Sequence, residues 1–165
     1  EYGIIKKGNK KLSTHTNRIP ENDYGLSKAI FSDQSEDLAK KFNCKARIMR
    51  IFPTFGAGEN PKRLFPSLLK AIKYNKNFFI NNPYEKRDFS NVNFVSKIIL
   101  DSLDFKKKPF KNNQIWHVSE NKPKYINEFA GILWKKHKAK GKLIFKKSSK
   151  SFFTHISDDS SLWKP

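Results

Sequence analysis

The pattern of apolar and polar positions predicts four helices. In four segments apolar residues recur at intervals of three or four, which places them on one face of an α-helix. The predicted helices span residues 22–42, 61–74, 94–103 and 124–137. We expect Asp23 to cap the first and Pro61 to open the second. The positions expected to face the core in the first and last helices are Leu26, Ala29, Ile30, Leu38, Phe42, Ile126, Phe129, Ile132 and Leu133.

Short runs of β-branched and aromatic residues between these helices predict strands. They span residues 46–52, 78–81, 89–92, 114–119 and 142–146. Polar residues with glycine, serine or proline dominate 4–20 and 148–161, which we expect to be loops. Because strands alternate with helices, the predicted class is α/β.

Composition limits the class of protein. The chain has 165 residues, of which 37% are hydrophobic, enough for a folded core. No apolar run approaches the roughly 20 residues of a membrane span, so we expect no membrane partner. The single cysteine, Cys44, excludes an internal disulfide, is expected to be a buried inert thiol, and fits a reducing, cytoplasmic location. The four histidines show no ligand spacing, so no metal site is expected.

The net charge of +19 allows two interpretations. A basic chain can bind polyanions such as nucleic acid. Here the excess is mostly lysine spread along the whole chain, and arginine, the better bidentate reader of phosphate, is scarce. We therefore do not expect nucleic acid to be the partner, although a non-catalytic basic module that binds polyanions stays an alternative function.

Candidate chemistry lies in the segment 24–28, Tyr-Gly-Leu-Ser-Lys. Residues four apart share a helix face, so Lys28 is expected beside Tyr24. A cation next to a phenol favours the phenolate and lowers its pKa from about 10. A tyrosine tuned in this way can act as a general acid or base.

Five segments in order resemble a known family. They are Glu1-Tyr2-Gly3, Tyr24 to Lys28, Arg50-Ile51-Phe52 leading to Phe55-Gly56, Lys62 to Pro66, and Arg87-Asp88-Phe89. Their order and spacing over most of residues 1–133 resemble the extended short-chain dehydrogenase/reductases, specifically the NAD-dependent nucleotide-sugar epimerases and dehydratases.

The resemblance implies part of a Rossmann-type doubly wound parallel sheet with a small α/β substrate-binding domain. Residues 1–60 would be the remainder of the dinucleotide-binding domain. Residues 61–165 would be mostly the substrate-binding domain, with the helix near 94–103 returning to the Rossmann part. The Gly-rich amino-terminal half of the family fold has no counterpart here, so we expect a carboxyl-proximal fragment that is inactive alone.

The resemblance also assigns roles. Tyr24 matches the catalytic tyrosine, and Lys28 the lysine that tunes it and holds the nicotinamide ribose. Ile51, Phe52 and Pro53 match the loop lining the nicotinamide of NAD or NADP. Pro53 stands where the family usually has a substrate-binding asparagine. Arg63 and Arg87 match positions that contact a nucleotide sugar's diphosphate, although Arg87 could instead pair with its neighbour Asp88.

The implied function is an NAD(P)-dependent nucleotide-sugar epimerase, dehydratase or reductase. A short-chain reductase of a non-sugar carbonyl is a second alternative. Family members are often dimers through the helix that carries the tyrosine, so a homodimer is expected, with Ser32, Ser35 and Ala39 near the contact. We expect Trp163 to be a core residue whose partners lie beyond Pro165.

Overall fold

A computed structural model of the protein describes residues 2–3, 11–104, 114–146 and 154–164. The predicted loops at 4–20 and 148–161 lie partly outside these ranges. The helices are α1 (Asp23–Lys41), α2 (Leu64–Lys73), α3 (Val92–Ser102), α4 (Ile126–Lys136) and the short 3-10 helix η1 (Asp159–Ser161). All four predicted helices are confirmed, and η1 lies within a stretch predicted as loop.

The strands are short. They are β1 (Arg47–Ile51), β2 (Thr54–Phe55), β3 (Phe78–Ile80), β4 (Lys86–Arg87), β5 (Ser90–Asn91), β6 (Gln114–Val118), β7 (Lys124–Tyr125), β8 (Leu143–Phe145) and β9 (Thr154–His155). The predicted strands correspond to β1, β3, β5, β6 and β8. The other four strands, each of only two residues, were not predicted.

Pairing is mostly parallel. β1 pairs with β6, β2 with β5, β3 with β8, and β4 with β9, all in parallel, while β4 and β7 run antiparallel. The register of the longest pair sets Arg47 opposite Gln114 and Ile51 opposite Val118. The fold is therefore α/β with parallel strands, as predicted.

Two helix starts differ from the prediction. Asn22, not Asp23, caps α1, because its side-chain oxygen accepts from the Gly25 amide at 2.8 Å. The second helix begins at Leu64 rather than Pro61, because the chain first makes a turn in which the Arg63 amide donates to the Asn60 carbonyl at 2.9 Å. Pro66 then falls in the first turn of α2, where a missing amide costs no intrahelical bond.

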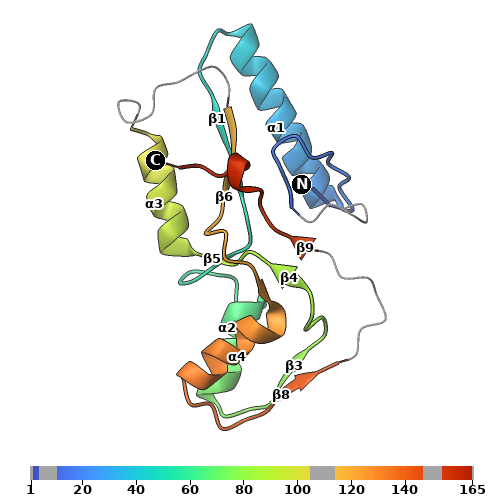
Figure 1. The fold of residues 1–165 in the computed structure, drawn as a ribbon, viewed down its shortest axis with the longest axis vertical. Coiled ribbons are helices and arrows are strands. Elements are labelled where there is room, and N and C mark those ends of the chain that lie inside the picture. Colours follow the sequence, from blue (N-terminus) through green and yellow to red (C-terminus); the bar gives the residue numbers. More distant parts are fainter. Residues whose placement is uncertain (1, 4–10, 105–113, 147–153, 165) are drawn as a thin grey trace.

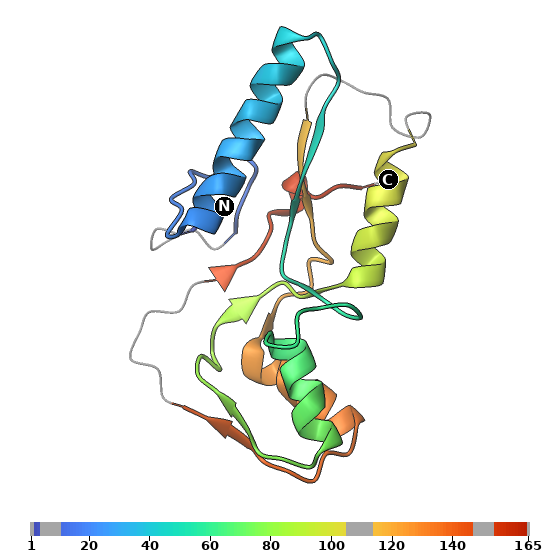
Figure 2. The same ribbon diagram turned by 180° about the vertical axis from the view of Figure 1, so that it is seen from behind.

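The core is divided between the two ends of the molecule. At one end, α2, α4, β3 and β8 enclose a cluster around Leu68, Ile80 and Ala130 (Figure 1). At the other end, α3 packs against β6 around Val95 and Val118. The view from behind shows the same separation, with α2 and α4 side by side far from α1 (Figure 2). The strand connections between these ends carry most of the predicted site residues.

The first helix buries only small side chains. Its buried residues are Gly25, Ala29, Ser32 and Ala39. Several expected core positions are instead 45–64% exposed, namely Leu26, Ile30, Leu38 and Phe42. The expectation for those four was wrong, because periodicity shows that a face is apolar but not what covers it. In α4, Ile132 is also exposed, while Phe129 is buried.

Two single-residue expectations are also corrected. Cys44 is exposed rather than buried, since it follows the end of α1 at the surface. Trp163 is only 5% exposed and finds its partners within the chain. Its ring lies 5.7 Å from that of Trp116 and 4.7 Å from the Arg47 guanidinium carbon. These contacts hold the carboxyl-terminal segment against β6.

Candidate functional site

Tyr24 and Lys28 lie on successive turns at the start of α1. The Lys28 Nζ is 5.5 Å from the centroid of the Tyr24 ring. Tyr24 is 72% exposed and Lys28 is also exposed. The Asn22 cap fixes the first turn, so the phenol and the ammonium project from an ordered helix end. Both side chains are therefore accessible from solvent.

The segment 51–53 continues from the carboxyl end of β1. Ile51 is half exposed, whereas the Phe52 ring is buried in a cluster with Tyr2 and Leu12. The Phe52 amide donates to the Val118 carbonyl at 3.0 Å, and the Pro53 carbonyl accepts from the Ser90 amide at 2.9 Å. The segment is therefore fixed by its backbone, and Ile51 presents the most side-chain surface.

Both predicted substrate arginines are paired with glutamates. Arg63 directly precedes α2 without a side-chain cap bond, and its Nε lies 3.1 Å from Glu59 Oε1. Arg87, in β4, donates through Nε and Nη2 to Glu85 Oε1 at 2.8 and 2.7 Å. The alternative pairing of Arg87 with Asp88 is wrong, because the Asp88 side chain points into the protein.

Asp88 is fully buried and joins β5 to the loop after β6. Its carboxylate accepts from the Ser119 hydroxyl and, at 3.1 Å, from the Lys122 amide. Burial raises the pKa of Asp88, against the effect of these hydrogen bonds. In return, Glu120 Oε1 accepts from the Asn91 amide at 2.8 Å. The two carboxylates tie the loop at 119–122 to the start of α3.

A buried polar network that the sequence analysis missed surrounds His117. His117 Nε2 lies 2.5 Å from the Tyr2 hydroxyl, and Nδ1 lies 2.8 Å from Ser157 Oγ. Arg50 Nη1 donates to the same tyrosine oxygen at 2.8 Å and to the Thr14 carbonyl at 3.0 Å. The network thus joins the amino-terminal segment, β1, β6 and the carboxyl-terminal segment.

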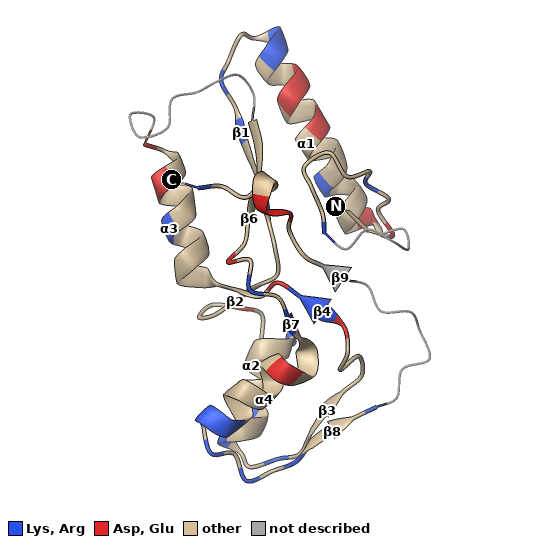
Figure 3. Ribbon diagram, viewed as in Figure 1, with Lys and Arg blue, Asp and Glu red and all other residues tan. Residues whose placement is uncertain are grey.

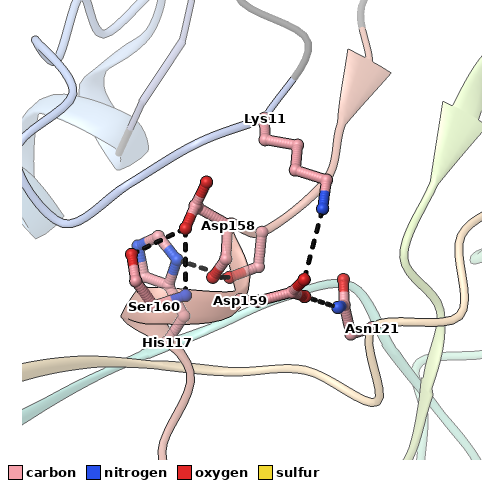
Figure 4. Close-up of polar contacts among 7 residues, drawn as sticks. Lys11, His117, Asn121, Asp158, Asp159 and Ser160 are labelled. Carbon is pink, nitrogen blue, oxygen red and sulfur yellow. Dashed lines mark hydrogen bonds and ion pairs between the residues drawn. The ribbon is translucent and has the colours of Figure 1, made fainter.

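The neighbouring carboxyl-terminal turn adds exposed polar contacts. Asp158 accepts from the Ser160 hydroxyl at 2.6 Å and from the Ser160 amide at 2.9 Å, and these two bonds lower the pKa of Asp158. Asp159 bonds Asn121 and lies 3.5 Å from Lys11 Nζ. Figure 4 shows His117 beside this turn, and Lys11 and Asn121 reaching Asp159 from two other segments. A histidine within the apolar run of β6 was the signal for this network.

A cleft lies elsewhere, beside the first helix. The cleft, of about 860 Å³, is bounded by the loop 14–20, one side of α1, and strands β1 and β6. Leu26, Ala29, Ile30 and Trp116 line it, but none of the predicted cofactor or substrate residues does. This cleft is therefore separate from Tyr24, Ile51, Arg63 and Arg87.

The described ranges offer no sign of a metal centre or a membrane span. No three histidine, cysteine, aspartate or glutamate side chains gather there as metal ligands. None of the helices described is long and apolar enough to cross a membrane. Basic side chains lie on many of the elements and are interspersed with acidic ones, as Figure 3 shows, whereas β3 and β8 carry neither.

Comparison with known proteins gives consistent results. Residues 1–115 match the sequence model of the NAD dependent epimerase/dehydratase family. A UDP-glucose 4-epimerase of Vibrio cholerae is 32% identical over 110 residues, which are 66% of this chain and 32% of that enzyme.

Solved structures share the fold. RMD from Pseudomonas aeruginosa, complexed with NADPH, superposes with a TM-score of 0.83 at 14% identity, over 96% of this chain and 54% of that one. UDP-glucuronic acid 4-epimerase from Bacillus cereus, in complex with UDP-glucuronic acid and NAD, gives 0.80 at 21% identity, over 96% and 50%.

The chain thus spans about a third of the curated relative and about half of these structures. Its parallel α/β fold is the Rossmann-type fold of those enzymes. The family match covers well over half of the sequence, including the Tyr24 and Lys28 helix. This chain belongs to the NAD-dependent epimerase/dehydratase family.

Proposed function

We propose that this chain supplies the acid–base tyrosine and part of the nucleotide-sugar site of an NAD(P)-dependent epimerase, dehydratase or reductase. The observation that carries the proposal is the exposed pair of Tyr24 and Lys28, 5.5 Å apart, on the capped first turns of α1 in a member of this family. Tyr24 would take the proton of a sugar hydroxyl and return it at the end of the reaction.

The exposed groups suit the nicotinamide end of NAD or NADP. Lys28 offers three N–H donors for ribose hydroxyls. Ile51, Phe52 and Pro53 follow the carboxyl end of a parallel strand, where ligands bind in open α/β sheets. When bound, the cofactor would accept or donate the hydride at the sugar carbon. Lys28 would then orient the ribose while Tyr24 holds the proton.

A nucleotide diphosphate sugar is the proposed substrate. Solved relatives are complexed with UDP-sugars such as UDP-glucuronic acid. Arg63 and Arg87 carry planar guanidinium groups that suit a diphosphate. In this proposal residues 1–60 serve the cofactor, and residues 61–165 mostly serve the substrate, with α3 returning to the cofactor side.

A homodimer through α1 is a further part of the proposal. Ser32 and Ala39 are buried within the chain, so the contact would not use them as expected. Three exposed apolar side chains towards the other end of the same helix, Phe31, Leu38 and Phe42, form the surface that supports such a contact. Sedimentation should then show a dimer that the double substitution of Phe31 and Leu38 by lysine converts to a monomer.

The test is an assay of the complete reading frame that contains this chain. UDP-glucose, UDP-glucuronic acid and UDP-N-acetylglucosamine would be supplied with NAD or NADPH. Tyr24→Phe should lower kcat by about 10²- to 10⁴-fold and leave the Kd for the nucleotide sugar unchanged, because the lost hydroxyl moves a proton.

Tyr74→Phe is the matched control. Tyr74 is also exposed, and the Lys73 Nζ lies 5.6 Å from its ring. Equal effects of the two substitutions would contradict the assignment of Tyr24. Turnover of simple ketones without nucleotide sugars would favour the non-sugar reductase. Binding of nucleic acid or heparin alone, with a steep salt dependence, would favour the basic module.

A further inference from the structure

Glu85 and Arg87 form a closely matched pair at β4. Residues two apart on an extended strand face the same side. Glu85 Oε1 accepts from Arg87 Nε at 2.8 Å and from Nη2 at 2.7 Å. The glutamate side chain is 8% exposed, whereas that of the arginine is 39% exposed. The carboxylate therefore lies beneath the guanidinium, and the arginine faces solvent.

Glu85 is held by its backbone. Its amide donates to the Asn82 carbonyl at 3.2 Å, and its carbonyl accepts from the Ile126 amide at 3.0 Å. The adjoining strand β4 is paired on both edges, with β7 and β9. Glu85 is thus a fixed acceptor, and the longer arginine side chain is the member of the pair that adapts.

The geometry leaves one edge of the guanidinium available. Arg87 has five N–H donors in a planar fork. Glu85 uses Nε and one proton of Nη2, which share an edge. The opposite edge keeps Nη1 and the second proton of Nη2. Among the described residues, Nη1 has no hydrogen-bond partner. Two parallel donors therefore remain for a phosphate.

We propose that Glu85 is a positioning residue that fixes the Arg87 guanidinium so that its outer edge binds the substrate diphosphate. The inference rests on the proposed function, because it concerns the same nucleotide-sugar site. Orientation is valuable here because a free arginine loses much rotamer freedom on binding. Glu85 and Arg87 are separated only by Lys86 in the sequence.

The charge of Glu85 and its proposed positioning role predict opposite effects on diphosphate binding when the side chain is removed. The carboxylate is close to the anion site, so on charge alone its removal should strengthen diphosphate binding. If Glu85 positions Arg87, its truncation should weaken binding despite that gain. Glu85→Gln separates the two effects, because the amide oxygen can still accept the hydrogen bonds while the charge is lost.

The experiment uses the ¹⁵N-labelled 165-residue chain titrated with UDP, and with uridine as the control without a diphosphate. Glu85→Ala should weaken UDP binding by about three- to ten-fold. Glu85→Gln should restore it to the unsubstituted level or better, and uridine binding should not change. The Arg87 Nε–H resonance should be sharp in the unsubstituted protein and Glu85→Gln, and broadened in Glu85→Ala, with backbone resonances away from β4 unchanged.

Several results would overturn the inference. One such result is that Arg87→Ala weakens UDP binding, whereas Glu85→Ala binds UDP as tightly as the unsubstituted chain or more tightly. Glu85 would then only neutralise the arginine, and the proposed function would stand. If Glu85→Gln unfolds or loses UDP as fully as Glu85→Ala, the role is structural. If UDP does not shift Arg87 in any variant, the proposed function itself fails at this site.

Discussion

At the scale of single residues, burial decides what the polar groups do. His117 is completely buried between the Tyr2 hydroxyl and Ser157. A neutral imidazole can donate at one nitrogen and accept at the other, which suits both contacts. Burial, assisted by the nearby charge of Arg50, lowers the pKa of His117 from its usual 6.5 to about 4. The network therefore requires the neutral ring.

This shift predicts acid sensitivity. The unfolded chain binds a proton on His117 below pH 6.5, while the folded chain resists until about pH 4. Stability from this residue is therefore complete above pH 6.5 and is lost as the pH falls toward 4. The loss should be roughly 3 kcal/mol, at 1.36 kcal/mol for each unit of pKa. Urea unfolding at a series of pH values measures it.

His117→Asn is the comparison for that measurement. Asparagine keeps a donor and an acceptor but does not titrate. The free energy of unfolding of the variant should therefore lack the part of the pH dependence that comes from His117. The raised pKa of Asp88 acts in the opposite direction, because its contribution is lost as the pH rises through that pKa. Since both proteins contain Asp88, only the difference between them reports His117. If the free energy of unfolding changed with pH in the same way in both proteins, His117 would not be the source of the acid sensitivity.

At the scale of elements, side-chain caps fix the starts of two helices next to predicted site residues. α1 begins at the Asn22 cap and carries Tyr24 in its first turn. α3 begins at Asn91, whose amide is bound by Glu120 and whose side chain accepts from Asn93. Side-chain caps thus fix the starts of α1 and α3, whereas α2, which begins after Arg63, has no side-chain cap.

The cap of α1 can be tested directly. Asn22→Ala should lower the free energy of unfolding by about 1 kcal/mol, because the Gly25 amide loses its acceptor. Asn22→Asp should stay close to the original stability, since the carboxylate accepts the same bond and favours the helix amino terminus. Chemical denaturation compares the three proteins. An alanine variant as stable as the aspartate variant would show that the cap contributes nothing.

Single helices and strands were predicted better from the sequence than the contacts between segments that lie far apart along the chain. Helices α2 and α4 were found because each buries one apolar stripe against the other. The four missed strands, such as β4, form only through partners far along the chain. The same limit applies to the site. Tyr24 and Lys28 are local neighbours and were predicted together, whereas the His117 network joins segments more than 100 residues apart.

At the scale of the whole molecule, the two larger core clusters among the described residues lie apart. One surrounds Leu68 and Ile80 between α2 and α4, and the other surrounds Val95 and Val118 beside α3. Extended segments connect the two ends, as Figure 1 shows. We therefore expect the two ends to unfold as separate units.

Leu68→Ala tests that expectation. Leu68 is fully buried, so the cavity should cost about 2–5 kcal/mol. Calorimetry should show two transitions, of which the substitution lowers one. Leu100→Ala is the control, because Leu100 is 67% exposed and its loss should change neither transition. A single transition that moves as a whole would show one cooperative unit.

The arrangement of β1 has a consequence for the exchange of its amide hydrogens. Among the described strands, β1 pairs only with β6. The Phe52 amide donates to Val118, and amides alternate along a strand, so those of Arg50 and Ile48 also point toward β6. The amides of Met49 and Ile51 point the other way. In deuterated water, deuterium should therefore enter Met49 and Ile51 quickly and Ile48 and Arg50 slowly. If another strand paired with this edge of β1, hydrogen exchange at Met49 and Ile51 would slow.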